Sequence, residues 1–175
     1  MKKFGVQDMV FCALFAAVTA VLAQVSVPIG PVPITLGTLG IMLCGMALGV
    51  RNGGVAVGCY LLLGLVGVPV FAGFRGGVAV LAGPTGGYLV GYLPCALLCG
   101  LAAKRECAFP KRCLLGAGGA AVYYVLGTAF FMVSTGSTLW ASLTACVLPF
   151  LPGDAAKIIL SASLSPRLQK VMERR

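Results

Sequence analysis

The sequence VPVFAGFRGGVAVLAGPTGGYLVGY, from Val68 to Tyr92, decides how the rest of the chain is arranged. It lies between two apolar segments that are too long for a soluble fold, and it contains too much glycine and proline to be a simple turn. Its only charged residue is Arg75. The stretch therefore predicts a long loop outside the bilayer that leads back into a membrane-spanning segment.

The second half of this stretch is predicted to open a helix, because Pro84 suits a first helical turn, where its missing N–H costs nothing. Gly83, Gly87 and Gly91 then recur every four residues, which would let a neighbouring backbone approach closely. Tyr88 lies on another strip of the same helix. We expect the loop and this helix to form the lid and the wall of a small-ligand site.

The composition indicates an integral membrane protein built of helices. Of the 175 residues, 59% are hydrophobic and 10% are charged, whereas soluble domains contain about 25% charged residues. A helix needs about 20 residues to cross the bilayer, so the length allows six spans and leaves no room for a soluble domain. We therefore predict an all-α integral membrane protein with a single transmembrane domain over residues 1–175.

Six transmembrane helices are predicted, with the long outward loop between helices 3 and 4. The first apolar run continues without a break, so we interpret it as a retained span and not as a cleaved signal peptide. A tight turn at Arg51–Gly54 is expected to join the second and third spans, and Pro149, Pro152 and Gly153 are expected to break the sixth. The expected spans are about Phe4–Val27, Ile34–Val50, Val55–Val68, Pro84–Ala103, Cys113–Val133 and Leu139–Pro166.

The basic residues predict the orientation of the chain in the cytoplasmic membrane. An even number of spans places both termini on one side, and that side collects eleven of the 13 lysines and arginines. By the positive-inside rule, both termini are expected in the cytoplasm and the 68–83 loop outside. The net charge of +9 does not indicate nucleic-acid binding, because the basic residues form short clusters without a continuous stripe.

Asp154 and Lys157 are the strongest site candidates that the residues themselves indicate. Asp154 lies twelve residues before Pro166, which is roughly 18 Å along a helix and near the middle of the bilayer. A charge there costs on the order of 3 kcal/mol, and residues three apart can partly neutralise each other. Broken helices near the midplane are where transporters place their ligands. The alternative is a purely structural ion pair.

Two long motifs carry a family resemblance. PVFAGFRGG followed by LAGPTGGYLVGY, and PFLPGDAAK from Pro149 to Lys157, resemble the signatures of the BioY family, the biotin-binding S subunits of energy-coupling factor (ECF) transporters. A third and weaker match is VPITLGTLGIMLCGMALG, from Val32 to Gly49, where Gly37 stands at a position that is usually Gln in the family. The order and spacing of the three motifs fit nearly the whole chain.

The resemblance implies a six-helix S subunit that binds biotin with high affinity and takes it up across the cytoplasmic membrane. Asp154 would accept hydrogen bonds from the ureido N–H groups, and Lys157 would donate to the ureido oxygen or keep Asp154 ionised. Arg75 would close over the carboxylate, since a guanidinium–carboxylate pair is strong. Tyr88 would pack against the rings. The roles of the two cations could be exchanged.

The resemblance also implies partners. A transmembrane coupling subunit and two ATP-binding subunits would drive transport, so ATP would be used by the partners and this chain would need no cofactor. The first span offers small residues at helical spacing, Ala13 and Ala17 on one strip and Ala16 and Ala20 on another. They are candidates for docking on the coupling subunit, and packing within the chain is the alternative.

Other functions are less well supported by the sequence. An S subunit for another small vitamin would share the architecture but not these motifs. An enzyme is not expected, because the sequence has no histidine and no GxxxxGK[ST] phosphate-binding loop. A channel would need polar residues along several spans. No metal site or disulfide is expected, because the eight cysteines contain no CxxC pair and fall mostly in apolar spans.

Overall fold

The computed structural model describes residues 5–28, 32–103 and 107–173 of the chain. Most of these residues are helical, and two short strands pair in antiparallel fashion, Ser26 with Thr35 and Val27 with Ile34. The elements in chain order are α1 (Val6–Gln24), β1 (Ser26–Val27), β2 (Ile34–Thr35), α2 (Gly37–Leu65), α3 (Val78–Ala82), α4 (Gly86–Gly100), the 3-10 helix η1 (Leu101–Ala103), α5 (Phe109–Thr135), α6 (Leu139–Cys146) and α7 (Leu151–Glu173).

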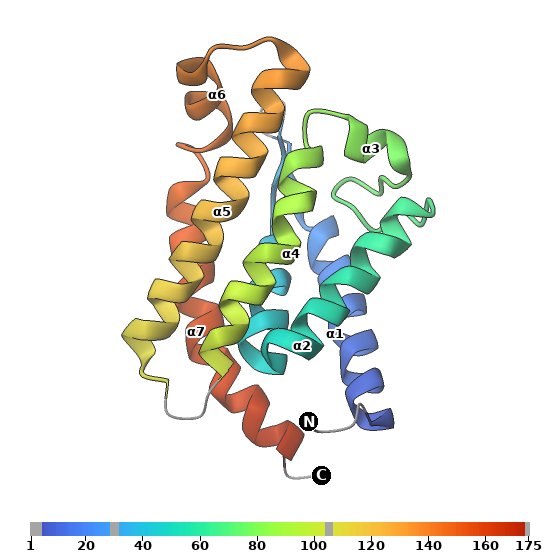
Figure 1. Cartoon of the computed structure of the whole chain (residues 1–175), viewed down its shortest axis with the longest axis vertical. Coiled ribbons are helices and arrows are strands. Elements are labelled where there is room, and N and C mark those ends of the chain that lie inside the picture. Colours follow the sequence, from blue (N-terminus) through green and yellow to red (C-terminus); the bar gives the residue numbers. More distant parts are fainter. Residues whose placement is uncertain (1–4, 29–31, 104–106, 174–175) are drawn as a thin grey trace.

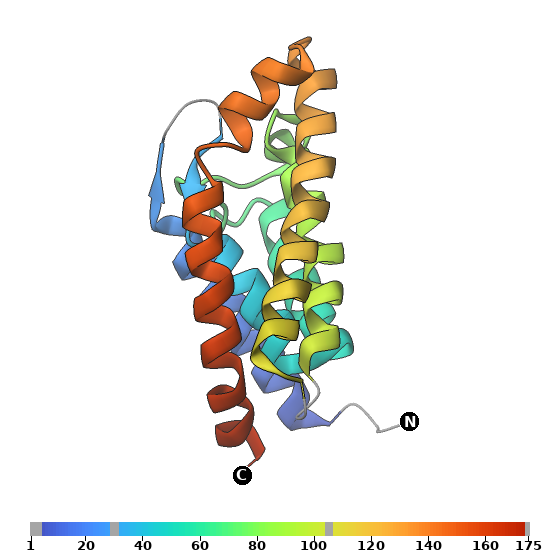
Figure 2. The same ribbon diagram turned by 90° about the vertical axis from the view of Figure 1, so that its left-hand side faces the viewer.

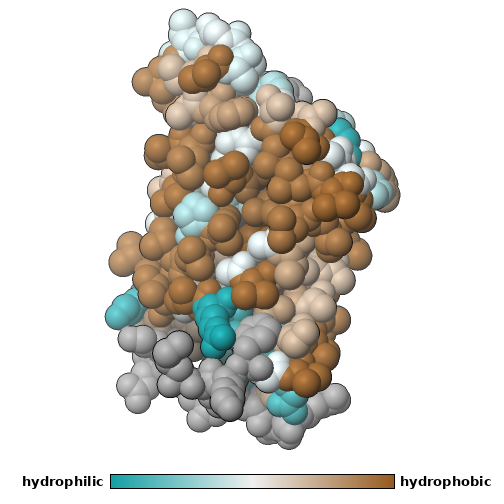
Figure 3. Space-filling view, turned by 45° about the vertical axis from the view of Figure 1, so that its right-hand side comes forward, coloured by the Kyte–Doolittle hydropathy of each residue, from teal (hydrophilic) through white to brown (hydrophobic). Residues whose placement is uncertain are grey.

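The helices form an elongated bundle in which α4, α5 and α7 run roughly along the long axis (Figures 1 and 2). By length and composition, α1, α2, α5 and the α4–η1 segment can each cross a membrane, and the bent pair α6–α7 can form a fifth span. These spans confirm the helical membrane class, whereas the count of six helices stays a prediction. Figure 3 shows a largely hydrophobic face of the molecule, as a lipid-facing surface requires.

The two ends of the bundle differ in content. The beginning of α1 and the end of α7 lie at one end, whereas α6, the α3 loop and the two strands lie toward the other (Figures 1 and 2). The long segment predicted between helices 3 and 4 is the connection from α2 to α4, and it contains the short helix α3. The α3 loop, the start of α4 and the start of α7, which carry the two long motifs, therefore lie in the half of the molecule away from the termini.

Gly49 divides α2 into two helices. Its φ of 85° lies in the left-handed region that favours glycine, and the chain bends there. The two halves correspond to the predicted second and third spans, but the tight turn expected at Arg51–Gly54 is wrong, because those four residues are helical. The halves pack closely beyond the bend, since a Cβ on Gly53 would lie 2.5 Å from the Cys44 carbonyl oxygen.

The small-residue face of α4 packs against α5, as predicted. A Cβ on Gly87 would lie 2.5 Å from the Leu126 carbonyl oxygen, and a Cβ on Gly91 would lie 2.7 Å from the Tyr123 Cα. Any larger residue at either position would push the two backbones apart. This close approach fixes the distance between the two helices that form most of the site described below.

Two helix starts differ from the prediction. The helix α4 begins at Gly86, so Pro84 and Gly83 precede it instead of forming its first turn. The helix α5 begins at Phe109 instead of Cys113, because Pro110 occupies a first-turn position where proline is favourable. The sequence predicts a charged connector at Lys104–Arg112, and its last four residues are therefore helical. Cys107 and Ala108 precede the helix, and residues 104–106 lie outside the described residues.

The last predicted span is broken at Pro149, as expected, but α7 begins at Leu151, before Pro152 and Gly153, and ends later than expected. The chain bends by 53° between α6 and α7, and Pro152 falls in the first turn of α7, where it interrupts no hydrogen bond. The helix does not end at Pro166 but continues to Glu173. Beyond that proline, the Gln169 amide donates to the Met46 and Ala103 carbonyl oxygens at 2.9 and 3.0 Å, which ties the last turns to α2 and η1.

Candidate functional site

A pocket lies between the start of α2, the α3 loop, α4, α5 and the start of α7. The space between its walls amounts to about 680 Å³ when the part that is open to solvent is included. All four residues predicted for substrate binding line it, and so do all five tyrosines of the chain. The lining residues with polar side chains are Thr35, Thr38, Tyr60, Arg75, Thr85, Tyr88, Tyr92, Tyr123, Tyr124, Asp154 and Lys157.

Asp154 and Lys157 form the predicted ion pair on one face of α7. The Lys157 Nζ lies 2.8 Å from the Asp154 Oδ1, and both side chains are almost completely buried. Asp154 belongs to the first turn of α7, where the helix dipole favours a negative charge. The proline-rich break before α7 thus places a carboxylate at a helix start inside the bundle.

The Lys157 ammonium is fully engaged by three acceptors. Besides Asp154, it donates to the Thr35 carbonyl oxygen at 2.8 Å and to the Thr38 Oγ1 at 3.0 Å. An ammonium group has three N–H donors, so each of them has a partner. These contacts join α7 to β2 and the beginning of α2, which are more than a hundred residues away in the sequence.

Two adjacent tyrosines complete the surroundings of Asp154, and the sequence reasoning missed both. The Tyr123 and Tyr124 hydroxyls donate to the Asp154 Oδ2, Tyr124 at 2.5 Å. With Lys157 on Oδ1, the carboxylate accepts three hydrogen bonds, which offset the cost of burying it. The available signal was a pair of adjacent tyrosines in the middle of an otherwise largely apolar span.

Tyr88 forms part of the pocket wall, as predicted. Its hydroxyl donates to the Cys146 carbonyl oxygen at 3.2 Å and lies 3.5 Å from the Thr128 Oγ1. Its ring lies over Gly127, where a Cβ would collide with it. The buried ring therefore presents an aromatic surface to the pocket while its polar atom is satisfied between α5 and the α6–α7 break.

Arg75 lies at the mouth of the pocket. It is exposed, and its Nε donates to the Ala72 carbonyl oxygen at 3.2 Å within the loop. The structure therefore separates the two predicted cations: Lys157 lies in the interior and Arg75 at the entrance. A ligand with polar groups at both ends and an apolar body between them would match this arrangement.

Comparison with known proteins decides the family. The BioY family profile matches residues 1–174 of the chain. The chain belongs to the BioY family. A biotin transporter BioY from Thermotoga maritima is 36% identical to it over 165 residues, which cover 94% of this chain and 97% of that protein. A biotin transporter BioY from Rhodobacter capsulatus is 38% identical over 170 residues, 89% of each chain.

A solved structure matches this BioY chain throughout. It is the crystal structure of the S-component for biotin from an ECF-type ABC transporter, with a TM-score of 0.88 and 32% sequence identity. The match covers 94% of this chain and 92% of the other. The resemblance inferred from the motifs is thereby confirmed, and relatives named as transporters agree with the prediction that the chain is not an enzyme.

The third motif contributes a glycine and two threonines to the pocket wall. Gly37 lines the pocket, and a Cβ there would lie 3.2 Å from the Ala23 Cβ and 3.3 Å from its Cα. A glutamine at this position would need α1 to move. The polar contacts from this motif are made instead by Thr35 and Thr38, which hold Lys157.

The alanines of α1 lie away from the pocket, in a separate apolar groove that α1 forms with the second half of α2. Ala13 and Ala17 are exposed, Ala20 is half-buried, and Ala16 is buried. All four line the groove, together with Met9, Cys12, Val55, Cys59, Leu62, Leu63, Val66 and Val70. Ala16 thus belongs partly to the core, whereas Ala13 and Ala17 are open to contact from outside.

Proposed function

We propose that this chain binds biotin in the tyrosine-lined pocket and is the substrate-specific S subunit of an ECF-type transporter. The observation that carries the proposal is the pocket itself. It has a buried Asp154–Lys157 pair at its inner end and Arg75 at its mouth. It occurs in a member of the BioY family whose structure matches that of a biotin S-component.

The chemistry of biotin fits these two ends. Biotin has an apolar bicyclic body, a ureido group with two N–H donors and one carbonyl oxygen, and a carboxylate on a flexible arm. At the inner end, Asp154 and the tyrosine hydroxyls on it can accept from the ureido N–H groups. Lys157 can donate to the ureido oxygen in exchange for its hydrogen bond to Thr35 or Thr38. At the mouth, Arg75 can pair with the carboxylate. The rings of Tyr88 and its neighbours would enclose the bicycle.

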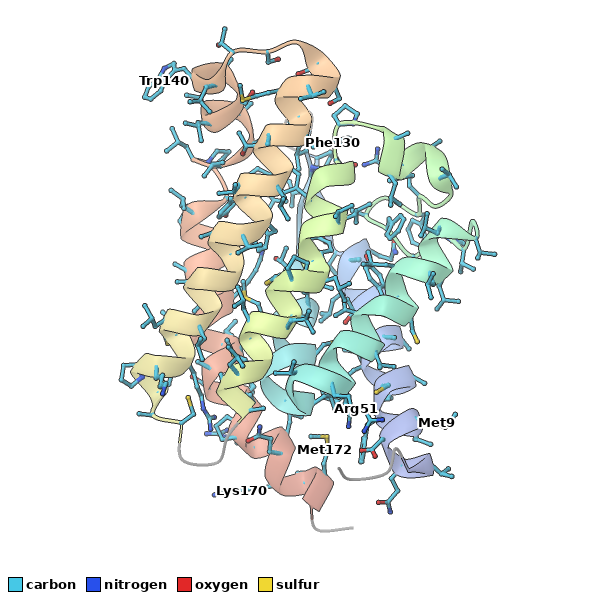
Figure 4. The ribbon with its side chains drawn as sticks, viewed as in Figure 1. Met9, Arg51, Phe130, Trp140, Lys170 and Met172 are labelled. Carbon is cyan, nitrogen blue, oxygen red and sulfur yellow. The ribbon has the colours of Figure 1, made fainter. Side chains whose placement is uncertain are left out.

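The membrane arrangement that we propose has six spans, with α2 counted as two. The termini would be cytoplasmic and the mouth of the pocket would face outward. In support, Arg51 and Lys170 lie toward the end where α1 begins, whereas Trp140 lies at the opposite end (Figure 4). An excess of lysine and arginine on one side is the usual mark of the cytoplasmic face.

Transport requires partners in this proposal. The groove of α1 and α2 would receive a transmembrane coupling subunit, and two ATP-binding subunits would supply the energy. The support is that Ala13 and Ala17 leave an exposed, small-residue surface of the kind that lets helices approach closely in a membrane. The groove is formed by different residues from the pocket, so a partner could dock while the ligand is bound.

Equilibrium binding of biotin to the purified chain in detergent tests the proposal. Saturable binding at micromolar biotin or below is expected, and an excess of a different vitamin such as riboflavin should not compete. Absence of binding at micromolar biotin would overturn the proposal. Competition by another vitamin with higher affinity would show that the chain is an S subunit for that vitamin instead.

A further inference from the structure

Gln24, the last residue of α1, bonds to the loop that carries Arg75. The backbone N–H of Phe74 donates to the Gln24 Oε1 at 2.9 Å. The Gln24 Nε2 donates to the Pro69 carbonyl oxygen at 3.4 Å and to the Ala20 carbonyl oxygen of its own helix at 3.1 Å. One side-chain amide therefore joins α1 to both the beginning and the tip of the 69–75 loop.

The loop is a tight hairpin whose tip is strained. Phe71 and Arg75 pair as an isolated bridge, with N–H to O distances of 2.9 and 3.3 Å, so residues 72–74 form the turn. Phe74 has a φ of 55°, an uncommon conformation for a residue with a side chain. Such conformations persist only where the surroundings hold them. Phe74 is 73% exposed, so besides the Phe71–Arg75 bridge that closes the turn, the contact that holds it is its backbone bond to Gln24.

The other side of the hairpin is anchored independently. The Phe71 ring is buried and packs edge-on against Tyr60, with ring centroids 5.6 Å apart. Gly64 leaves the room for that ring. Loss of the Gln24 contact would therefore loosen the tip of the hairpin at Phe74, directly before Arg75, while the bridge to Phe71 keeps the hairpin in place.

We propose that Gln24 is a positioning residue that fixes Arg75 over the mouth of the pocket for the carboxylate of the ligand. The inference rests on the proposed function, because it takes the ligand to be biotin and Arg75 to be the group that meets its carboxylate. Gln24 itself does not line the pocket. It acts by restricting the Phe74 backbone, which precedes Arg75 directly.

The test compares the affinity for biotin with the affinity for biotin methyl ester, which has no carboxylate. The parent should prefer biotin, and Arg75→Ala should abolish that preference. Gln24→Met keeps the length of the side chain but removes its hydrogen bonds. It should reduce the preference for biotin by roughly two- to twelvefold, the equivalent of one neutral hydrogen bond, and leave ester affinity nearly unchanged. In the Arg75→Ala background, Gln24→Met should have no further effect.

Gln169→Met is the matched control. Gln169 also joins separate elements through its side-chain amide, but it does so near the end of α7, away from the pocket. This change should lower thermal stability and leave the ratio of the affinities for biotin and biotin methyl ester unaltered. A merely structural Gln24 would behave like Gln169, with a lower melting temperature and an unchanged ratio, and that result would overturn the inference.

The remaining outcomes separate this inference from the proposed function. If the parent binds neither ligand, the proposed function itself fails. If Arg75→Ala leaves the preference for biotin intact, the role of Arg75 is wrong and the inference falls with it. If Arg75→Ala abolishes the preference but Gln24→Met does not change it, the proposed function stands and the inference alone is overturned.

Discussion

The tyrosine-lined pocket and the α1–α2 groove belong to the same small helical bundle, yet the residues that line them differ in polarity. The pocket contains a buried ion pair, and β2, the start of α2 and α5 supply hydrogen bonds that hold this pair in place. The groove is lined by alanines and other apolar residues. With the roles proposed above, the contrast separates a site for a polar ligand, whose groups are held in place beforehand, from a docking surface in lipid, which needs small side chains.

The first way to sharpen this comparison is to ask which side of the membrane each region faces. With the eight native cysteines replaced, Arg75→Cys should react with an impermeant thiol reagent added from outside, because the pocket mouth is proposed to face outward. Lys111→Cys, at the start of α5, should react only when the reagent reaches the inner face. The expected effect is all or none. Labelling of Lys111→Cys from outside would contradict the proposed arrangement.

Asp154→Asn should give the largest change in affinity. It removes a charged acceptor and leaves Lys157 without its counter-ion. Hydrogen bonds to charged groups contribute about 1.5–3 kcal/mol, so biotin affinity should fall by roughly ten- to a hundredfold or more. Binding and thermal unfolding should be measured on the same sample.

The double change Asp154→Asn with Lys157→Met is the control for that experiment. Removing both charges should recover stability, because no uncompensated buried charge remains. Affinity should remain poor if the pair binds the ligand. A double variant that binds biotin like the parent would show that the pair is only structural.

Ala17→Leu should affect the groove and spare the pocket. The larger side chain would keep a partner helix from close approach, and overpacking of this kind costs about 1–3 kcal/mol. Co-purification with the coupling and ATP-binding subunits should therefore weaken, while biotin affinity stays unchanged. Ala121→Leu, at an exposed position of α5, is the matched control and should leave assembly intact. Loss of biotin binding with normal assembly would indicate packing within the chain instead.

Tyr124→Phe should have the smallest effect of the four experiments proposed for the pocket and the groove. It removes one of the two hydroxyls on the Asp154 Oδ2 and keeps the ring. A neutral hydrogen bond contributes about 0.5–1.5 kcal/mol, so affinity should fall by roughly two- to twelvefold in a titration with biotin. Tyr60→Phe also removes a hydroxyl from the pocket wall, but the Tyr60 hydroxyl does not donate to Asp154. This variant should therefore lose less biotin affinity than Tyr124→Phe. Equal losses for the two variants would argue against a specific role for the hydroxyls on Asp154.

The parts of the site that could be predicted from the sequence are those set by neighbours along the chain. Asp154 and Lys157 are three residues apart on one helix, so their pairing follows from helical geometry. The close approach of α4 and α5 likewise follows from the spacing of Gly87 and Gly91. Together with the motifs, these local patterns were enough to indicate the helical membrane class and the location of the pocket.

The parts that could not be predicted depend on contacts between distant segments. Nothing within α5 shows that the hydroxyls of Tyr123 and Tyr124 meet a carboxylate thirty residues later. Pro166 normally argues for the end of a helix, and only the tertiary contacts of Gln169 explain why α7 continues. The bend in α2 was predicted a few residues too late, because the Asn and Gly residues at 52–54 are a stronger turn signal in the sequence than Gly49, where the chain bends.

The gathering of every tyrosine into one pocket has an optical consequence. The chain has a single tryptophan, Trp140, whose side chain is 73% exposed on α6. In a Trp140→Phe variant, the near-ultraviolet circular dichroism and the intrinsic fluorescence would come chiefly from phenols that line the ligand site. Ligand entry could then be followed in real time without a label, and each Tyr→Phe change would show which part of the wall the signal reports.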